Sequence, residues 1–108
     1  MKIFLTGSSG MVGRNILDDP ASKQHDFIVP SRQELDSLDV GSVTTMLAKT
    51  QPDIVIHAAG HVGGIQANLK DPKVFLLNNL YMALNVIGSA DKLGINKLLN
   101  LGSSCMYP

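Results

Sequence analysis

Three glycines near the start of the chain, Gly7, Gly10 and Gly13, follow directly on the apolar run Ile3-Phe4-Leu5 at a spacing of three residues. A strand that turns straight into a helix through such glycines points free backbone N–H groups, and the positive end of the helix dipole, at one spot. This arrangement is a seat for a pyrophosphate, so the pattern predicts a dinucleotide-binding loop. The spacing is Gly-x-x-Gly-x-x-Gly rather than Gly-x-Gly-x-x-Gly, and we therefore expect the middle glycine to bring the backbone close to phosphate.

Apolar runs alternate with helix-like segments along the whole chain. The predicted strands lie at 3–5, 27–29, 54–56 and 97–101, and their apolar residues stand next to each other rather than alternating with polar ones. Such strands are buried on both faces, which indicates a parallel sheet covered by helices. We therefore predict an α/β fold, a Rossmann-like parallel sheet with helices on both faces that is incomplete at the carboxyl end, with residues 1–108 forming part of one domain.

Three helices are predicted between these strands. The first opens at the glycine loop, the second is capped by Asp39 and ends at Gln51-Pro52-Asp53, and the third runs from Asp71-Pro72 to a stop at Gly94. Their expected apolar faces are Val12, Ile16 and Leu17 in the first; Val40, Val43, Met46 and Leu47 in the second; and Leu76, Leu80, Ala83, Leu84, Ile87 and Ala90 in the third.

Composition excludes several classes of function. The 108 residues carry nine basic and nine acidic side chains, scattered singly, with a net charge of zero. Nucleic acid and anionic membranes both require a concentrated basic face, so neither is an expected partner. The sequence has no membrane-spanning apolar window and no signal-peptide pattern, from which we expect a cytoplasmic protein. Cys105 is the only cysteine, so its thiol is either core filler or chemistry.

The end of the second predicted strand, Val29-Pro30-Ser31-Arg32, bears on the choice of cofactor. In dinucleotide folds an acidic residue at this position binds the ribose hydroxyls of NAD, whereas an arginine accommodates the 2′-phosphate of NADP. The tip of this strand has no acid, and Arg32 beside Ser31 suits a phosphate, so we predict NADP. Alternatively, Arg32 is a solvated loop residue that pairs with Glu34.

At this level of detail the chain resembles the extended short-chain dehydrogenases/reductases. The glycine loop, the strand 52–59, the helix containing Asn79 and the strand ending at Gly102-Ser103-Ser104 follow that family's order. Two stretches, 61–68 and 96–108, are similar in particular to its GDP-L-fucose synthases, the GDP-4-keto-6-deoxymannose epimerase-reductases. The resemblance implies two epimerisations next to a ketone, followed by hydride delivery from NADPH to that ketone.

The resemblance implies roles for two residues of the last stretch. Ser103 matches the family serine that hydrogen-bonds the keto oxygen, and the alternative is a cap for a backbone group at a strand end. Cys105 matches the family thiol that moves protons on the sugar ring during epimerisation. The alternative for Cys105 is an inert buried cysteine.

Cofactor contacts also follow from the resemblance. The glycines of the loop would bind the pyrophosphate, with Met11 and Val12 adding backbone donors. Ala58, Ala59 and Gly60 would leave flat space against the adenosine side, and Asn79 either supports the active site by hydrogen bonds or is an ordinary polar helix residue. His57 and His61 suggest a metal site, but they do not converge as a helical pair would and no third ligand is near, so we predict none.

The chain departs from the family pattern in two respects. Ser8 and Ser9 stand in the glycine loop where many members carry basic residues, which weakens the case for a strong 2′-phosphate clamp. The family's Tyr-x-x-x-Lys pair is absent, and no lysine lies four residues after Tyr107. We therefore expect the amino-terminal, NADP-binding portion of a GDP-sugar epimerase-reductase, inactive alone and homodimeric when complete. The alternatives are another nucleotide-sugar enzyme of this family or a non-catalytic dinucleotide-binding module.

Overall fold

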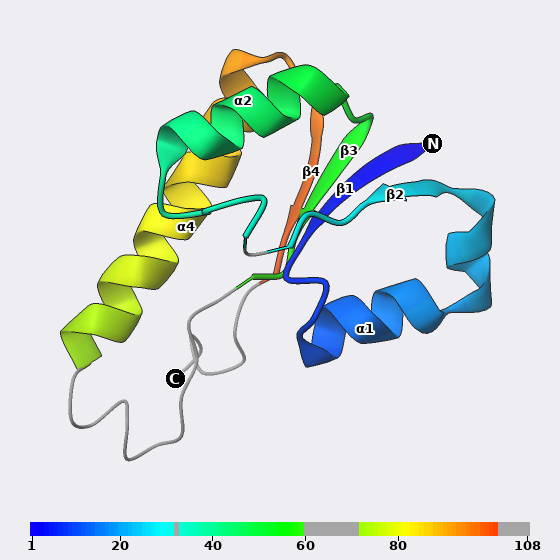
Figure 1. Cartoon of the computed structure of the whole chain (residues 1–108), viewed down its shortest axis with the longest axis horizontal. Coiled ribbons are helices and arrows are strands. Elements are labelled where there is room, and N and C mark those ends of the chain that lie inside the picture. Colours follow the sequence, from blue (N-terminus) through cyan, green and yellow to red (C-terminus); the bar gives the residue numbers. More distant parts are fainter. Residues whose placement is uncertain (32, 60–71, 102–108) are drawn as a thin grey trace.

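The computed structural model describes residues 1–31, 33–59 and 72–101. The described strands form one parallel sheet, with helices on both sides of it (Figure 1). The elements in chain order are β1 (Lys2–Thr6), α1 (Met11–Asp18), the 3-10 helix η1 (Pro20–Gln24), β2 (Asp26–Ile28), α2 (Val40–Thr50), β3 (Ile54–His57), α4 (Pro72–Lys92) and β4 (Lys97–Asn100).

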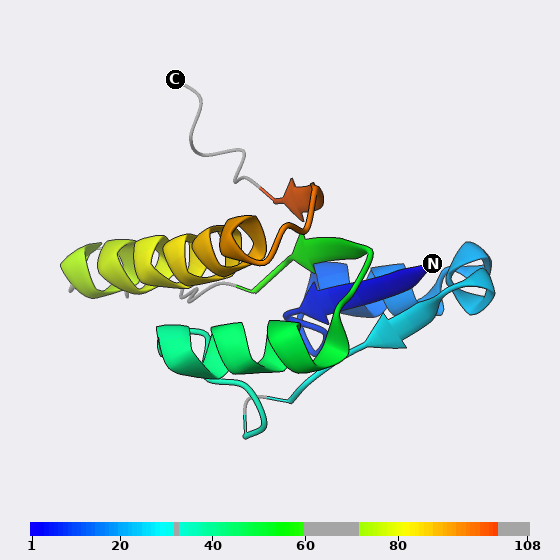
Figure 2. The ribbon, with the colours of Figure 1, turned by 90° about the horizontal axis from the view of Figure 1, so that it is seen from above.

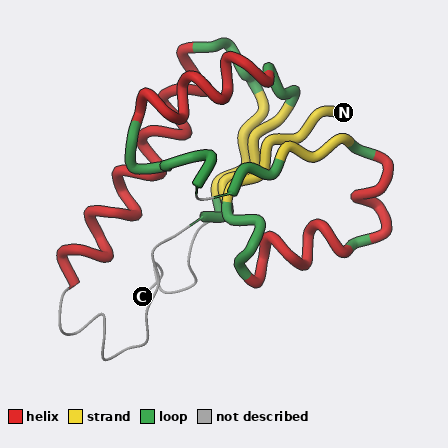
Figure 3. Tube along the Cα trace, viewed as in Figure 1, coloured by secondary structure: helices red, strands yellow, loops and turns green. Residues whose placement is uncertain are grey.

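The strand order is β2-β1-β3-β4, with every neighbouring pair parallel. The register aligns Thr6 of β1 with His57 of β3, and His57 with Asn100 of β4, so these carboxyl ends meet at one edge of the sheet. The tube trace in Figure 3 shows the glycine loop, between β1 and α1, leaving the sheet at this edge. The predicted Rossmann-like α/β fold is therefore confirmed.

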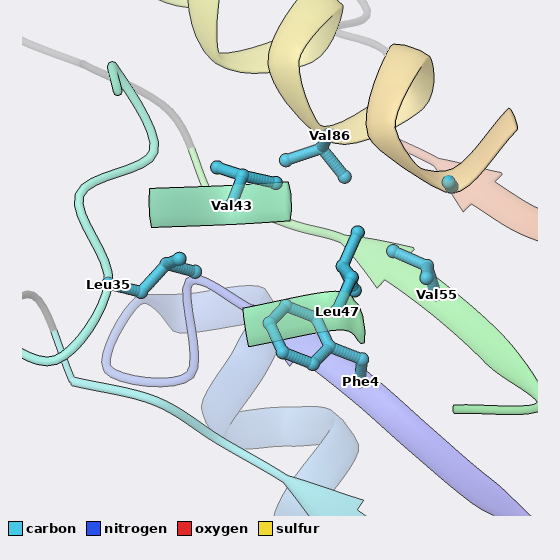
Figure 4. Packing of buried hydrophobic residues seen from close by; sticks show 7 residues of the cluster. Phe4, Leu35, Val43, Leu47, Val55 and Val86 are labelled. Carbon is cyan, nitrogen blue, oxygen red and sulfur yellow. The ribbon is translucent and has the colours of Figure 1, made fainter. Parts of the chain in front are cut away.

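The core lies between the sheet and the helices α2 and α4, which run side by side (Figures 1 and 2). Figure 4 shows Phe4 of β1 and Val55 of β3 facing Val43 and Leu47 of α2 and Val86 of α4. All five side chains are fully buried, and Leu35 and Ala90 complete the cluster. Ile3 and Leu5 alternate with Phe4 and so belong to the other face of β1, where they are also buried. Burial on both faces accounts for the continuous apolar character of this central strand.

The predicted helix boundaries are largely confirmed. The Asp39 side chain caps α2 by accepting a hydrogen bond from the Gly41 N–H at 2.9 Å. Gly94 follows α4 with a φ of +74°, a conformation that glycine adopts without strain, and the next residue, Ile95, donates its N–H to the Ala90 carbonyl. No helix in the described ranges is long and apolar enough to cross a membrane.

The predicted buried faces of α1 and α2 are wrong in part. In α1 the buried residue is Gly13, whereas Val12 is 42% exposed and Ile16 and Leu17 are only half-buried. The Gly13 backbone packs closely against the loop at Gly7, and the Ile16 carbonyl accepts a hydrogen bond from the Ser22 hydroxyl of η1. In α2, Val43 and Leu47 are buried as predicted, but Val40, the first residue of the helix, is exposed.

The predicted face of α4 is also wrong in large part. Leu76, Leu80, Leu84 and Ile87 are exposed, while Ala90, at the edge of that face, is buried. The helix instead buries an adjacent side, with Val86 and Ser89, which contacts α2 and the segment before it. The Ser89 hydroxyl lies 2.9 Å from that of Thr44 in α2, and the Asn85 side chain donates at 2.9 Å to the carbonyl of Ser37, which precedes α2. Helical periodicity identified a leucine stripe but not the side facing the sheet.

Candidate functional site

The glycine loop is a tight turn at the carboxyl end of β1. Gly7 has a φ of +74°, and its carbonyl accepts the Gly10 N–H at 3.1 Å. The Gly10 carbonyl in turn accepts the Arg14 N–H at 2.9 Å, which begins α1. No side chain caps the amino end of this helix. The turn thus directs the start of α1, with its backbone donors and positive dipole end, to the carboxyl edge of the sheet.

The three glycines of this turn differ in the space around them. A Cβ added at Gly7 would lie 2.6 Å from the Ala58 carbonyl carbon and 2.6 Å from the Ala59 nitrogen. A Cβ added at Gly13 would lie 2.1 Å from the Gly7 carbonyl oxygen, which no side chain tolerates. Among the described residues, a Cβ added at Gly10 would meet only the Gly7 oxygen, at an ordinary 3.5 Å. Gly7 and Gly13 are therefore required by internal packing, whereas Gly10 borders open space.

Ala58 and Ala59 lie beside this loop. They follow β3 directly and are half-buried, and the Ala58 N–H donates to the Thr6 carbonyl at 3.2 Å. The structure therefore brings five of the predicted cofactor residues, the three glycines and the two alanines, to one place. Met11 and Val12 belong to the first turn of α1 and are both exposed.

Of the remaining predicted site residues, only Asn79 lies in the described part of the chain. Asn79 lies half-buried in α4. Arg32, Gly60, Ser103 and Cys105 are outside the described residues, as is His61. Next to position 32, Ser31 and Glu34 cap each other: the Ser31 N–H donates to the Glu34 carboxylate at 3.2 Å and the Glu34 N–H donates to the Ser31 hydroxyl at 3.3 Å.

Sequence reasoning missed a buried polar pair beneath the loop. The Thr6 hydroxyl is 2.7 Å from Nδ1 of His57, and the two residues are only 2% and 4% exposed. The same hydroxyl oxygen accepts the N–H groups of Ala58 and Ala59, each at 3.2 Å. Burial lowers the pKa of His57 below its ordinary value of 6.5, so the imidazole is neutral at pH 7. The available signal was that a threonine and a histidine each follow directly on a predicted strand.

The described surroundings of His57 contain no group of side chains that could bind a metal ion with it. Among the residues that the structure describes, no group of three or more His, Cys, Asp or Glu side chains could hold a metal ion. Its Nδ1 is already engaged by the Thr6 hydroxyl, which also accepts the N–H groups of Ala58 and Ala59.

Two cavities lie at other places in the described part of the chain, and the second is lined in part by Val12 of the glycine loop. One, of about 610 Å³, is at the amino ends of the strands and is lined in part by Met1, Pro52 and Lys97. The other, of about 440 Å³, lies between α1 and η1, with Ile16 and His25 in its lining. Open parallel sheets bind ligands at their carboxyl ends, so neither cavity is assigned to the dinucleotide.

Comparison with known proteins agrees with this geometry. The chain is 54% identical over 108 residues to the GDP-L-colitose synthase of Yersinia pseudotuberculosis, covering 100% of the chain and 35% of that protein. It is 45% identical over 107 residues to a GDP-L-fucose synthase of Azorhizobium caulinodans, covering 99% of the chain and 34% of that protein. Among solved structures, the NADP-bound GDP-mannoheptose C4 reductase MlghC of Campylobacter jejuni matches with a TM-score of 0.89 and 28% identity, covering 99% of this chain and 34% of that one.

The chain thus spans about a third of the length of the curated relatives that it matches. Residues 3–108, nearly the whole sequence, match the NAD dependent epimerase/dehydratase family. The resemblance seen in the glycine loop and in the two longer stretches is confirmed by these matches, and the chain belongs to the NAD dependent epimerase/dehydratase family.

Proposed function

We propose that this chain supplies the NADP-binding part of an enzyme that epimerises and reduces a GDP-linked keto-deoxy sugar. The observation that carries the proposal is the glycine turn at the carboxyl edge of the sheet, packed against Ala58 and Ala59 with open space at Gly10. The relatives named above are GDP-sugar synthases, and MlghC is a GDP-sugar reductase with NADP bound.

The residues present fit a dinucleotide. A pyrophosphate needs backbone donors, a helix amino end and room for close approach. Gly10 provides the room, since a side chain there would occupy space that no other part of the described chain fills. The amino end of α1, with Met11 and Val12 in its first turn, provides the donors, and Ala58 and Ala59 provide a flat surface for the adenosine side.

When bound, NADPH supplies the hydride for the reduction. Arg32 is proposed to hold the 2′-phosphate and so to favour NADPH over NADH. For the sugar chemistry we propose that Ser103 hydrogen-bonds the keto oxygen and that Cys105 transfers protons at the carbons beside it. Gly60 would extend the adenosine-facing surface, and Asn79 would support the site by hydrogen bonding. The complete protein is proposed to act as a cytoplasmic homodimer.

The sugar itself has two candidates. Conversion of GDP-4-keto-6-deoxymannose to GDP-L-fucose is favoured by the two stretches that resemble GDP-L-fucose synthases. Synthesis of the related GDP-L-colitose is favoured by the higher identity of 54% to the Yersinia pseudotuberculosis enzyme. Incubating the full-length protein with NADPH and each 4-keto precursor, and identifying the GDP-sugar formed, decides between these candidates. Binding of NADPH without turnover of either would favour the non-catalytic module.

The cofactor assignment is tested at Gly10 in the full-length protein. Gly10→Ala adds a methyl group that packs normally against Gly7 but enters the space assigned to the pyrophosphate. We expect the melting temperature to stay unchanged and the Kd for NADPH to rise at least about tenfold, because one charge-assisted hydrogen bond is worth about 1.5–3 kcal/mol. Gly88→Ala, where the added Cβ meets nothing within 4 Å, is the matched control. Wild-type affinity in Gly10→Ala would refute the assignment.

A further inference from the structure

We propose that Glu34 is a specificity-determining residue, whose carboxylate opposes the 2′-phosphate of NADP and so limits the preference for NADPH over NADH. The inference rests on the proposed function, because it concerns the adenosine end of the same cofactor. β2 pairs in parallel with β1, so its carboxyl end lies at the same edge of the sheet as the glycine loop. In a dinucleotide fold the end of this strand faces the 2′ position of the adenosine ribose.

The chain after β2 forms a tight turn that fixes the position of Glu34. The Ser31 carbonyl accepts the N–H groups of Glu34, at 3.1 Å, and of Leu35, at 2.9 Å. The Leu35 side chain is 5% exposed and belongs to the core cluster. The turn is therefore anchored in the core, although Ser31 and Glu34 are themselves exposed.

The Glu34 carboxylate is bonded to the end of the strand segment itself. It accepts the Ser31 N–H at 3.2 Å, while the Glu34 N–H donates to the Ser31 hydroxyl at 3.3 Å. A backbone N–H at this place also suits a phosphate oxygen, since hydrogen bonds to an ionised acceptor are the stronger ones. The carboxylate thus occupies a donor that the 2′-phosphate would otherwise use.

The other acids of this segment are bonded further along the chain. Asp36 accepts the Leu38 N–H at 3.0 Å, and Asp39 caps α2. The charged side chains that the structure describes between β2 and α2 are these two and Glu34, and among them Glu34 is the one bonded to Ser31. The described charge nearest to the strand end is therefore negative.

This charge distinguishes the two cofactors. A phosphate monoester carries about −1.5 to −2 charges near pH 7, whereas NADH has an uncharged hydroxyl at the same position. Repulsion by Glu34 raises the free energy of bound NADPH and leaves that of bound NADH nearly unchanged. The pyrophosphate is common to both cofactors, so its interactions cancel in the ratio of the two dissociation constants.

The test is Glu34→Gln in the full-length protein. Glutamine keeps an acceptor for the Ser31 N–H, so the turn and the melting temperature should stay unchanged while the charge is lost. We expect the Kd for NADPH in fluorescence titration to fall at least about threefold, and the Kd for NADH to change by less than about 1.5-fold. The gain should shrink in about 0.5 M KCl, because salt screens exposed charges.

Asp26→Asn is the matched control, since it removes one exposed carboxylate at the opposite, amino end of β2. It should leave the ratio of the two Kd values as in wild type. An unchanged ratio in Glu34→Gln, or an equal change of the ratio in the control, would overturn the inference. Weaker NADPH binding by Glu34→Gln would also overturn it, because Glu34 would then assist the phosphate.

Charge reversal gives a second variant that does not depend on an intact turn. Glu34→Lys loses the bond to the Ser31 N–H, but a disturbed turn affects both cofactors and the ratio still reports the charge. The preference for NADPH should rise in the order wild type, Glu34→Gln, Glu34→Lys, and any other order contradicts the inference. Wild-type protein that binds neither cofactor would refute the proposed function, whereas an unchanged ratio in proteins that bind both would refute this inference alone.

Discussion

The glycines of the turn illustrate how one residue type meets different physical demands. At Gly7 and Gly13 the backbone of a neighbouring segment occupies the place of a side chain, whereas Gly10 faces space. Of the three glycines, Gly10 is therefore the one that a ligand can approach. Substitutions at the first two therefore act on stability, and substitution at Gly10 acts on binding.

Gly13→Ala should be strongly destabilising. The added Cβ would fall 2.1 Å from the Gly7 oxygen, so α1 or the loop must move. Forcing a methyl group into a packed contact costs about 1–3 kcal/mol. Urea unfolding should show this loss relative to wild type, while Gly88→Ala should gain about 0.5–1 kcal/mol because alanine is the better helix former. A loss at Gly13 of less than about 0.5 kcal/mol would contradict the packing described.

His57 should make stability depend on pH. Burial lowers its pKa in the folded chain below the ordinary value of 6.5, so at lower pH the unfolded chain binds a proton that the native chain resists. The contribution of His57 is therefore unchanged above about pH 6.5 and becomes increasingly unfavourable as the pH falls below that value. His57→Asn, which cannot titrate, should lose less stability between pH 7.5 and pH 5.5 in urea unfolding. Equal losses in variant and wild type would show that His57 is not desolvated.

At the scale of elements, the free energy of unfolding of two variants tests which side of α4 is buried. Val86 is fully buried and Leu84 is 65% exposed. In the 108-residue chain Val86→Ala should cost about 1.5–3 kcal/mol, since it removes buried methyl groups and leaves a cavity. Leu84→Ala should change stability by less than about 0.5 kcal/mol. A larger loss of stability for Leu84→Ala than for Val86→Ala would show instead that the predicted leucine face is the buried one.

Local signals explain which elements could be predicted from the sequence. The strands, the Asp39 cap and the Gly94 stop depend on neighbouring residues, so the sequence carries them directly. The buried side of α4 depends on α2 and the segment before it, through Ser89 with Thr44 and Asn85 with Ser37, which are 45 and 48 positions apart in the sequence. The glycine loop, by contrast, is a local pattern and could be identified from the spacing of its glycines. The Thr6 and His57 pair became visible only when β1 and β3 were placed side by side in register.

At the scale of the molecule, exposed apolar side chains in the described part of the chain are most numerous on α4. Leu76, Leu80 and Leu84 are exposed along α4, and Leu99 of β4 and Leu101 after it are 49% and 38% exposed. Contiguous apolar surface of this kind promotes association. We expect the 108-residue chain to form concentration-dependent oligomers in light scattering after size exclusion. Leu80→Glu combined with Leu84→Glu should reduce the apparent mass, and a monodisperse wild-type monomer would show that this surface is harmless.

The central claim is that the glycine turn at the carboxyl edge of the sheet seats the pyrophosphate of NADP. The most direct measurement is a crystal structure of the full-length protein grown with saturating NADPH. The account predicts pyrophosphate oxygens at hydrogen-bonding distances of about 2.7–3.2 Å from backbone nitrogens in the first turn of α1, with Gly10 beside them. A pyrophosphate bound elsewhere, for example in the cavity lined by Met1, Pro52 and Lys97, would contradict it.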